Sequence, residues 1–146
     1  MRPTSRPQGF TVIELLITLV IVGILTAVAL PSYRAYIQRS KVPVALDALS
    51  AVATRMEQCY QDTGTYTGCG PCNTASLPTP NNFSLGCTIS TSGANAGRFF
   101  TVTATGSGPM YGYGYSIDST GARATTAHPN GSNSTCWTTR GTTCDT

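Results

Sequence analysis

The sequence predicts an α+β protein, in which one long N-terminal helix packs on an antiparallel sheet of three or four strands. Residues 10–30 form an apolar run with one charge, residues 44–62 continue at helical spacing with one apolar face, and residues 82–127 alternate apolar and polar side chains as strands do. The length of 146 residues suggests a single domain. A core of this size is small, so disulfides should contribute to its stability.

The apolar segment, residues 10–30, has the sequence FTVIELLITLVIVGILTAVAL, in which Glu14 is the one charged residue. A helix of this length is about 31 Å long, close to the thickness of a bilayer's hydrocarbon core. The alternative is a secretory signal peptide, but its apolar core is shorter, and no small-residue cleavage site appears before the chain continues helically past Pro31. We therefore interpret residues 10–30 as a retained transmembrane and assembly helix.

Two residues weaken this helix, Gly23 and Pro31, because glycine is flexible and proline removes a backbone donor and clashes with the preceding turn. A simple kink at Pro31 is the safer expectation. Pro43 is a further interruption. The sequence therefore predicts a curved helix rather than a straight rod.

The helical pattern continues over about residues 44–62, where apolar residues recur three and four positions apart. Polar side chains fall largely on the other side, which predicts an amphipathic helix with one face toward a core. Gly64 is expected to end this helix as its C′ residue. The expected apolar face consists of Leu46, Leu49, Ala53, Met56 and Tyr60.

The second half of the chain has the alternation typical of strands, and it completes an ectodomain that spans residues 31–146. A Ser-Thr-Gly turn at residues 119–121 is expected to join the last two strands. The predicted strands cover residues 82–90, 98–105, 113–117 and 122–126.

The chain has six cysteines, an even number in a short, Gly- and Thr-rich chain with an export-type N-terminus. This pattern indicates three disulfides in an oxidising compartment, so the leader that precedes the apolar segment is expected to stay in the cytoplasm. The spacing of Cys136 and Cys144 suits a local bridge that closes a C-terminal loop, residues 136–144.

The other four cysteines leave their pairing open: Cys87 is expected to join Cys69 or Cys72, and Cys59 takes the one that remains. Cys69-Gly70-Pro71-Cys72 also matches the thioredoxin redox motif. That chemistry needs the first cysteine at a helix N-terminus inside a βαβ unit. Here the motif leads into a loop with two prolines and no tryptophan precedes it, so we expect structural disulfides.

Charge and composition exclude several classes of function. Charged residues make up 10% of the chain, and the net charge of +3 falls to +1 without Arg2 and Arg6 of the leader, which is weak support for a nucleic-acid partner. Arg123, Arg140 and His128 are the one candidate basic patch for DNA, and a solvated face is the preferred interpretation. We expect no metal, no cofactor and no enzyme, because no metal-ligand set, phosphate loop or catalytic grouping is present.

Residues 9–15, Gly-Phe-Thr-Val-Ile-Glu-Leu, together with the apolar helix that follows, resemble the processing site of type IV pilins and their pseudopilin relatives. The resemblance implies the pilin fold. It also implies that a prepilin peptidase removes the leader, residues 1–9, by cutting between Gly9 and Phe10, and that the new amine of Phe10 is methylated. Residues 23–31 are implied to lose helical order in the filament, which would let the fibre stretch.

Glu14 needs a partner, because a carboxylate in a membrane helix costs about 2.5–3.5 kcal/mol on insertion scales. Cleavage would create a positive amine on Phe10, and methylation would leave it charged near neutral pH. Our hypothesis is that Glu14 pairs with the Phe10 amine of a neighbouring subunit and so sets the axial register, as a buried polar residue does in a coiled coil. The alternative is a pair with the amine of its own chain, one helical turn away.

The resemblance implies a structural subunit of a type IV pilus, a pilin or minor pilin that serves adhesion, twitching motility or DNA uptake. Its expected partners are other pilin subunits, the inner membrane and the prepilin peptidase. Its expected location is a single pass of the inner membrane with a periplasmic C-terminus, followed by the extracellular pilus. The alternatives are a DNA-binding minor pilin that acts as a receptor in DNA uptake, and a type II secretion pseudopilin.

Overall fold

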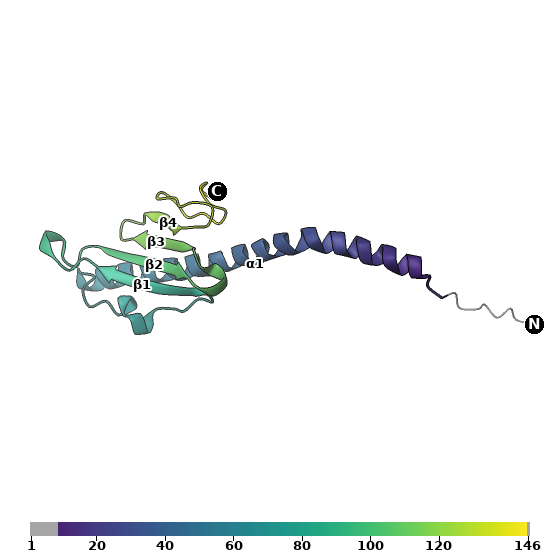
Figure 1. Ribbon diagram of the computed structural model, residues 1–146. Helices are drawn as coiled ribbons and strands as arrows, with labels where there is room; N and C mark the ends of the chain where they lie inside the picture. The colour runs from purple at the N-terminus through teal and green to yellow at the C-terminus, as the bar shows by residue number, and fades with distance from the viewer. Residues whose placement is uncertain (1–8, 146) are drawn as a thin grey trace, which may run out of the picture. The chain divides into compact units, whose positions relative to one another are not determined.

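The computed structural model describes residues 9–145, so residues 1–8 of the expected leader lie outside the described part (Figure 1). The chain divides into two compact units, one up to Ile37 and one from Gln38 onward, here called the N-terminal and the C-terminal unit. In chain order the elements are α1 (Val12–Thr63), η1 (Gly70–Cys72), η2 (Thr74–Ser76), β1 (Phe83–Ile89), η3 (Gly93–Asn95), β2 (Phe100–Gly106), η4 (Gly108–Met110), β3 (Gly114–Asp118) and β4 (Arg123–Ala127), where η marks a 3-10 helix.

Helix α1 is one continuous helix of 52 residues. It continues through Gly23, Pro31 and Pro43, so none of these residues ends the helix, and the kink expected at Pro31 stays a prediction. One proline removes one backbone hydrogen bond, and the Leu- and Ala-rich residues around it keep theirs. The loss of helical order over residues 23–31 in a fibre stays a prediction.

Threonines in the apolar segment of α1 bond the backbone of their own helix. Thr18 Oγ1 donates to Leu15 O at 2.8 Å, and Thr26 Oγ1 donates to Val22 O at 2.5 Å. These hydroxyls therefore find partners inside the helix, as a membrane requires of polar groups. By length and composition α1 contains a stretch that can cross a membrane, with a mean hydropathy of 2.7 over 18 residues and none of it buried within the chain.

In the C-terminal unit, the apolar face of α1 packs on the sheet and forms the core. The expected face residues Leu49, Ala53 and Met56 are buried, whereas Leu46 and Tyr60 lie partly buried at its border. Val42, Ala45 and Val52 complete the buried face of the helix. From the sheet, the core receives Phe83, Phe100, Val102, Ala104, Tyr115 and Ile117.

The sheet is an antiparallel meander in the order β1-β2-β3-β4 (Figure 1). Burial alternates along β2, where Phe100, Val102 and Ala104 face the core. The four strands lie where the sequence predicts them, within two residues at each end. Gly106 ends β2 where only glycine fits, because a Cβ there would lie 1.9 Å from Met110 O. The α+β prediction is confirmed.

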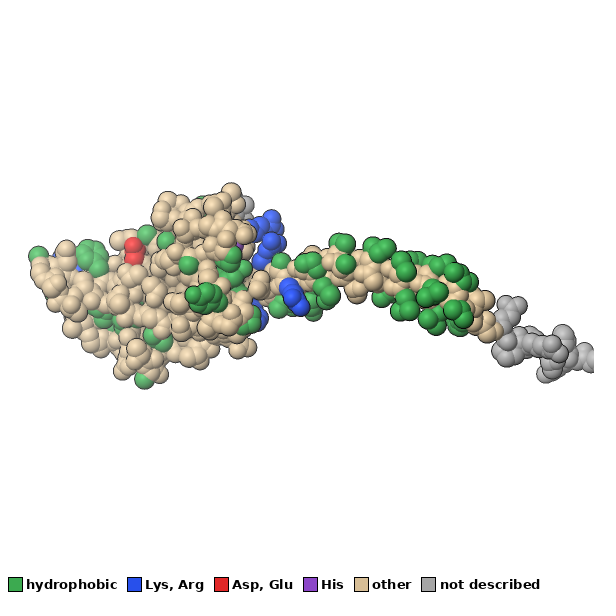
Figure 2. Space-filling view, viewed as in Figure 1, with side chains coloured by type: hydrophobic (Ala, Val, Ile, Leu, Met, Phe, Trp, Pro, Cys, Tyr) green, Lys and Arg blue, Asp and Glu red, His purple; other side chains and the backbone are tan. Residues whose placement is uncertain are grey.

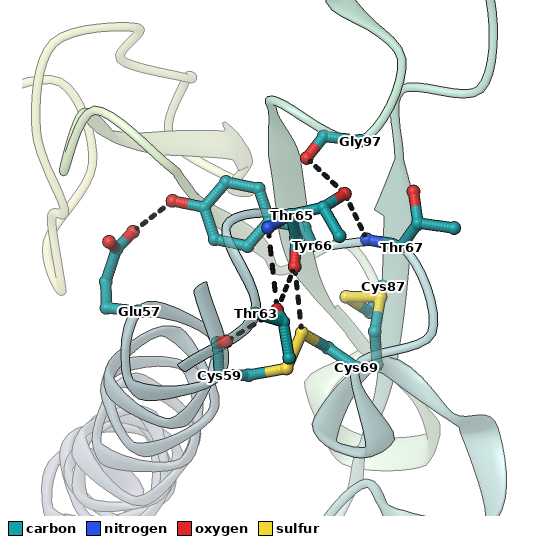
Figure 3. Close-up of a disulfide and its surroundings, with 10 residues drawn as sticks. Glu57, Cys59, Thr63, Thr65, Tyr66, Thr67, Cys69, Cys87 and Gly97 are labelled. Atoms are coloured by element: carbon teal, nitrogen blue, oxygen red, sulfur yellow. Dashed lines mark hydrogen bonds between the residues drawn. A yellow bond between two sulfur atoms is a disulfide. The ribbon is translucent and has the colours of Figure 1, made fainter. Parts of the chain in front are cut away.

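A loop rich in glycine and cysteine, residues 64–82, leads from α1 to the sheet and is held by two disulfides (Figure 3). Cys59 pairs with Cys69, and Cys72 pairs with Cys87, which is one of the two arrangements that the sequence left open. The two cysteines of the CGPC motif therefore belong to different bridges, and they do not form the redox pair of a thioredoxin.

Tyr66 fixes the end of α1 to the sheet. Its side chain is 4% exposed, and its hydroxyl donates to Glu57 Oε1 at 2.8 Å (Figure 3). Its ring packs against Tyr60 and edge-on against Phe100, with centroids 4.6 and 4.8 Å away. Burial, followed by the hydrogen bond to Glu57, raises the pKa of Tyr66 to about 12, so the hydroxyl stays a donor at neutral pH.

Candidate functional site

The expected processing site lies directly before α1, in a segment that is not helical. Gly9 and Phe10 are exposed, and the Phe10 side chain is 86% exposed. A Cβ added to Gly9 would meet nothing within 4 Å. The glycine is therefore not required by the packing of the chain itself.

Glu14 lies in the first turn of α1, where it has a local role that the sequence interpretation missed. Its backbone N–H donates to Thr11 Oγ1 at 3.4 Å, so Thr11 caps the helix. The signal was available, because Thr11-Val12-Ile13-Glu14 has the Ser/Thr-x-x-Glu spacing of a capping box. The carboxylate also lies near the positive end of the helix dipole. The Glu14 carboxylate thus favours the helix start.

The N-terminal unit exposes apolar side chains on all sides of α1, as Figure 2 shows along its visible face. Ile13, Leu19 and Ile24, for example, are each at least 60% exposed. An exposed apolar surface of this size marks contact with lipid or with other helices.

The C-terminal loop closed by Cys136–Cys144 is fastened to β4, where Thr125 is 1% exposed. Thr125 Oγ1 donates to Cys136 O at 3.0 Å and accepts from Thr138 N at 2.8 Å. Tyr115 OH donates to Thr138 O at 3.0 Å. Burial, with smaller contributions from Tyr113 and Asp145, raises the pKa of Tyr115, which keeps its hydroxyl a donor.

The three residues of the expected basic patch do not form one cluster. Arg123 and His128 lie at opposite ends of β4, about 17 Å apart along an extended strand. Arg140 lies beyond the His128 end, where its carbonyl accepts from Asn130 Nδ2 at 3.1 Å. The arrangement is an elongated surface, here called the C-terminal edge, which comprises β4 and residues 128–145.

His128 is part of the packing and adds little to this surface. Its ring stacks edge-on against Tyr113 at 4.8 Å, and its Nδ1 accepts from Asn130 N at 3.0 Å. Its Nε2 is buried without a hydrogen-bond partner within the described part of the chain. The expected role of His128 as an exposed basic residue is therefore wrong, because the ring fills a space beside Tyr113.

Arg123 is exposed and held in place by Trp137. Its guanidinium carbon lies 4.6 Å from the centre of the Trp137 ring, in a cation–π contact. Trp137 is fixed in turn, because its Nε1 donates to Ser116 O at 2.8 Å. A guanidinium that is stacked in this way loses less freedom when it binds a phosphate.

Negative charge is nearly absent from the C-terminal edge. Between Asp118 and Asp145 the sequence contains no acidic residue, and it is rich in Thr, Asn and Ser. Asp118 Oδ1 accepts from Thr120 N, Thr120 Oγ1 and Ala122 N at 2.8, 2.6 and 3.0 Å. Burial alone would raise the pKa of Asp118, but these hydrogen bonds lower it. Asp145 Oδ2 accepts from Thr139 N at 2.6 Å. Both flanking carboxylates are thus occupied by donors of the chain itself.

Comparison with known proteins shows which family the chain matches. A family described as "Type IV minor pilin ComP, DNA uptake sequence receptor" matches residues 31–140, most of the chain, and the prokaryotic N-terminal methylation motif matches residues 4–30. The chain belongs to the type IV minor pilin family.

Curated relatives match this minor pilin over its N-terminal part. The type IV major fimbrial protein FimA of Dichelobacter nodosus is 43% identical over 58 residues, which cover 40% of this chain and 37% of that protein. The fimbrial protein EcpC of Eikenella corrodens is 39% identical over 59 residues, 40% of this chain and 39% of that protein. The chain thus matches less than two fifths of the length of these relatives.

A solved structure shares the fold of the minor pilin over part of its chain. The crystal structure of the Neisseria meningitidis non-core minor pilin PilV matches with a TM-score of 0.53 and 15% identity, over 65% of this chain and 92% of that chain. At this identity the likeness supports the fold alone. In residues 9–145, no three His, Cys, Asp or Glu side chains gather in a group that would hold a metal ion.

Proposed function

We propose that this minor pilin is a subunit of type IV pili whose C-terminal unit binds double-stranded DNA. The observation that carries the proposal is the match of residues 31–140 to a family of DNA uptake sequence receptors. From the sequence alone, a solvated face was the preferred interpretation of Arg123, His128 and Arg140. The proposal reverses that preference because the family match covers these residues.

The C-terminal edge has the chemistry that a phosphate backbone needs. Arg123 and Arg140 are exposed, no carboxylate lies between Asp118 and Asp145 in sequence, and hydroxyl and amide side chains supply further donors. Phosphate contacts by such groups position a protein on DNA. The cation–π contact with Trp137 prepares Arg123 for this role.

Processing and membrane insertion belong to the same proposal. A prepilin peptidase cuts between Gly9 and Phe10, and the Phe10 amine is then methylated, as the match to the methylation motif over residues 4–30 supports. The apolar part of α1 holds the subunit in the inner membrane with the C-terminal unit in the periplasm. Other pilins then pack on the same apolar surface in the fibre.

A binding experiment with the full chain in detergent micelles tests DNA recognition. The double variant Arg123→Gln, Arg140→Gln is compared with a second double variant, Arg55→Gln, Arg98→Gln, which removes two exposed charges outside the C-terminal edge. We expect the double variant to bind duplex DNA more weakly at every sequence, and to lower the slope of log affinity against log salt by about one for each arginine. The matched variant should keep the affinity and slope of the parent chain.

Two outcomes would contradict this proposal. Absence of duplex binding by the parent chain at low salt would remove DNA as a ligand. Equal losses in the two double variants would show that net charge, and not the C-terminal edge, accounts for the affinity.

A further inference from the structure

The loop between β2 and β3, residues 107–113, presents an aromatic side chain that nothing in the C-terminal unit covers. Tyr111 is 84% exposed, whereas its neighbour Met110 is fully buried in the core. Ser107 N donates to Asn82 O at 2.8 Å, and Tyr113 N donates to Met110 O at 3.1 Å. The buried Met110 and these hydrogen bonds therefore hold the loop in place, and the Tyr111 side chain is exposed on it.

This loop is bonded to the first turn of the C-terminal unit. Gln38 Nε2 donates to Pro109 O at 3.1 Å, and Lys41 Nζ donates to Asn82 Oδ1 at 2.7 Å beside it. Gln38 follows Leu30, the last residue of the apolar segment, by eight residues of α1, which correspond to about 12 Å of helix. Headgroups extend about 5–8 Å beyond the hydrocarbon core. The headgroup layer therefore covers roughly half of this length of helix, and a long side chain spans the rest.

The charges on this part of α1 complement phospholipid headgroups. Between Glu14 and Asp47 the sequence has no acidic residue, and its three charges are Arg34, Arg39 and Lys41. Arg34 and Arg39 are exposed. Lys and Arg are usually enriched on the cytoplasmic side of a membrane helix. On the periplasmic side expected for this segment, these cations need an anionic partner nearby.

We propose that Tyr111 and Arg39 contact the phospholipid headgroups of the periplasmic leaflet while the subunit is anchored in the inner membrane. Tyrosine suits this position because its ring favours the apolar side of the interface and its hydroxyl the polar side. Arg39 pairs with headgroup phosphates. The lipid surface therefore holds the base of the C-terminal unit before assembly, and assembly must release it. This inference rests on membrane insertion and is independent of DNA binding.

Fluorescence of the full chain in liposomes tests the contact. The liposomes contain phosphatidylethanolamine and phosphatidylglycerol with brominated acyl chains, which quench nearby indoles. Tyr111→Trp is compared with Phe99→Trp, a 46% exposed aromatic at the other end of β2, and Trp137 gives the same background in both. We expect the added indole to lose intensity and shift to the blue in Tyr111→Trp and to do neither in Phe99→Trp. Arg39→Gln should reduce the quenching in Tyr111→Trp.

Four results would overturn the proposal. The first is equal quenching in the two tryptophan variants, and the second is no quenching in Tyr111→Trp although disulfide mapping shows native bridges. A blue shift that disappears when the chain is diluted in lipid would assign the surface to a second copy of the chain. Protection of the indole by duplex DNA in detergent, without lipid, would assign it to nucleic acid.

Discussion

Arg123 shows how a single side chain is prepared for a ligand by its neighbours. Trp137 stacks under the guanidinium, and the hydrogen bond from Trp137 to Ser116 O anchors that ring to the sheet. Such a side chain is already ordered, so less conformational entropy is lost when it binds. His128 illustrates the opposite outcome, because its ring is consumed by packing against Tyr113.

The first residue-scale prediction concerns Glu14→Leu. If Glu14 pairs with the Phe10 amine of a neighbour, the variant should insert and fold but fail to assemble, because an unpaired amine would enter an apolar bundle. Breaking one partner of a buried pair costs about 3–5 kcal/mol, a change of more than a hundredfold in an assembly equilibrium. The ratio of subunit in sheared fibres to subunit in membranes measures it. A ratio equal to that of the parent would mean that Glu14 acts only within its own chain, where its carboxylate lies near the positive end of the helix dipole.

Asp118 predicts how the stability of the C-terminal unit depends on pH. Its pKa is lowered in the folded chain, so it stabilises the fold above its unfolded pKa of about 3.9, and that contribution is lost as pH falls through the folded pKa. Asp118→Asn should therefore lower the melting temperature near neutral pH and make it less sensitive to acid below about pH 4. Thermal unfolding followed by near-ultraviolet circular dichroism over this range measures both effects. If the melting temperatures of the variant and the parent change with pH in the same way, the hydrogen bonds to the Asp118 carboxylate do not stabilise the fold.

At the scale of elements, the C-terminal loop holds its shape through one bridge and a few buried hydrogen bonds. The residues of Cys136–Cys144 are eight positions apart, and those of Cys59–Cys69 are ten apart. Loops of these lengths should lose similar stability when they are opened, about 2.5 kcal/mol each in the chain-entropy account. The two bridges therefore form a matched pair with different positions in the fold.

We expect Cys136→Ser, Cys144→Ser to weaken DNA binding, because Trp137 and Arg140 lie inside the loop that this bridge closes. Cys59→Ser, Cys69→Ser should cost similar stability and leave DNA affinity nearly unchanged. Urea unfolding gives the stability of each variant, and titration with duplex DNA at a temperature where both are folded gives the affinity. If both pairs lower affinity equally, the loop has no specific part in binding.

At the scale of the whole molecule, the two units are suited to different surroundings. The N-terminal unit exposes apolar side chains around a helix, whereas the C-terminal unit buries its apolar side chains between α1 and a sheet. One continuous helix serves both, because its first part is apolar on all sides and its second part on one side only. Lipid or neighbouring helices must replace, for the first part, the core that the second part has within its own unit.

Maturation of the whole chain gives the last prediction. The chain isolated from membranes should begin at a methylated Phe10, and Gly9→Trp should keep the leader, because a bulky side chain does not fit a peptidase site shaped for glycine. A Cβ at residue 9 meets nothing within 4 Å among residues 9–145, so retention would report on the peptidase and not on misfolding. Mass spectrometry of the intact protein measures the start. A start at Arg2, or beyond Leu30, in the parent chain would contradict processing.

The sequence by itself determined the order and type of the main elements. Periodicity located α1's amphipathic part and all four strands, because burial on one face imposes a repeat that depends only on local geometry. The local spacing of Cys136 and Cys144 was also sufficient to expect their bridge. The sequence was not sufficient to expect that α1 continues through Pro31 and Pro43, because helix-favouring neighbours outweigh one lost hydrogen bond.

Only the tertiary structure decided which distant residues meet. It chose Cys59–Cys69 and Cys72–Cys87 between two pairings that the sequence allowed equally, since the choice depends on where β1 lies beside the loop. In the folded chain His128 packs against Tyr113 and Arg123 stacks on Trp137. The loop that contains Tyr111 is hydrogen-bonded to Gln38. These contacts join residues far apart in the chain, and their formation depends on how the whole core closes, which no local pattern records.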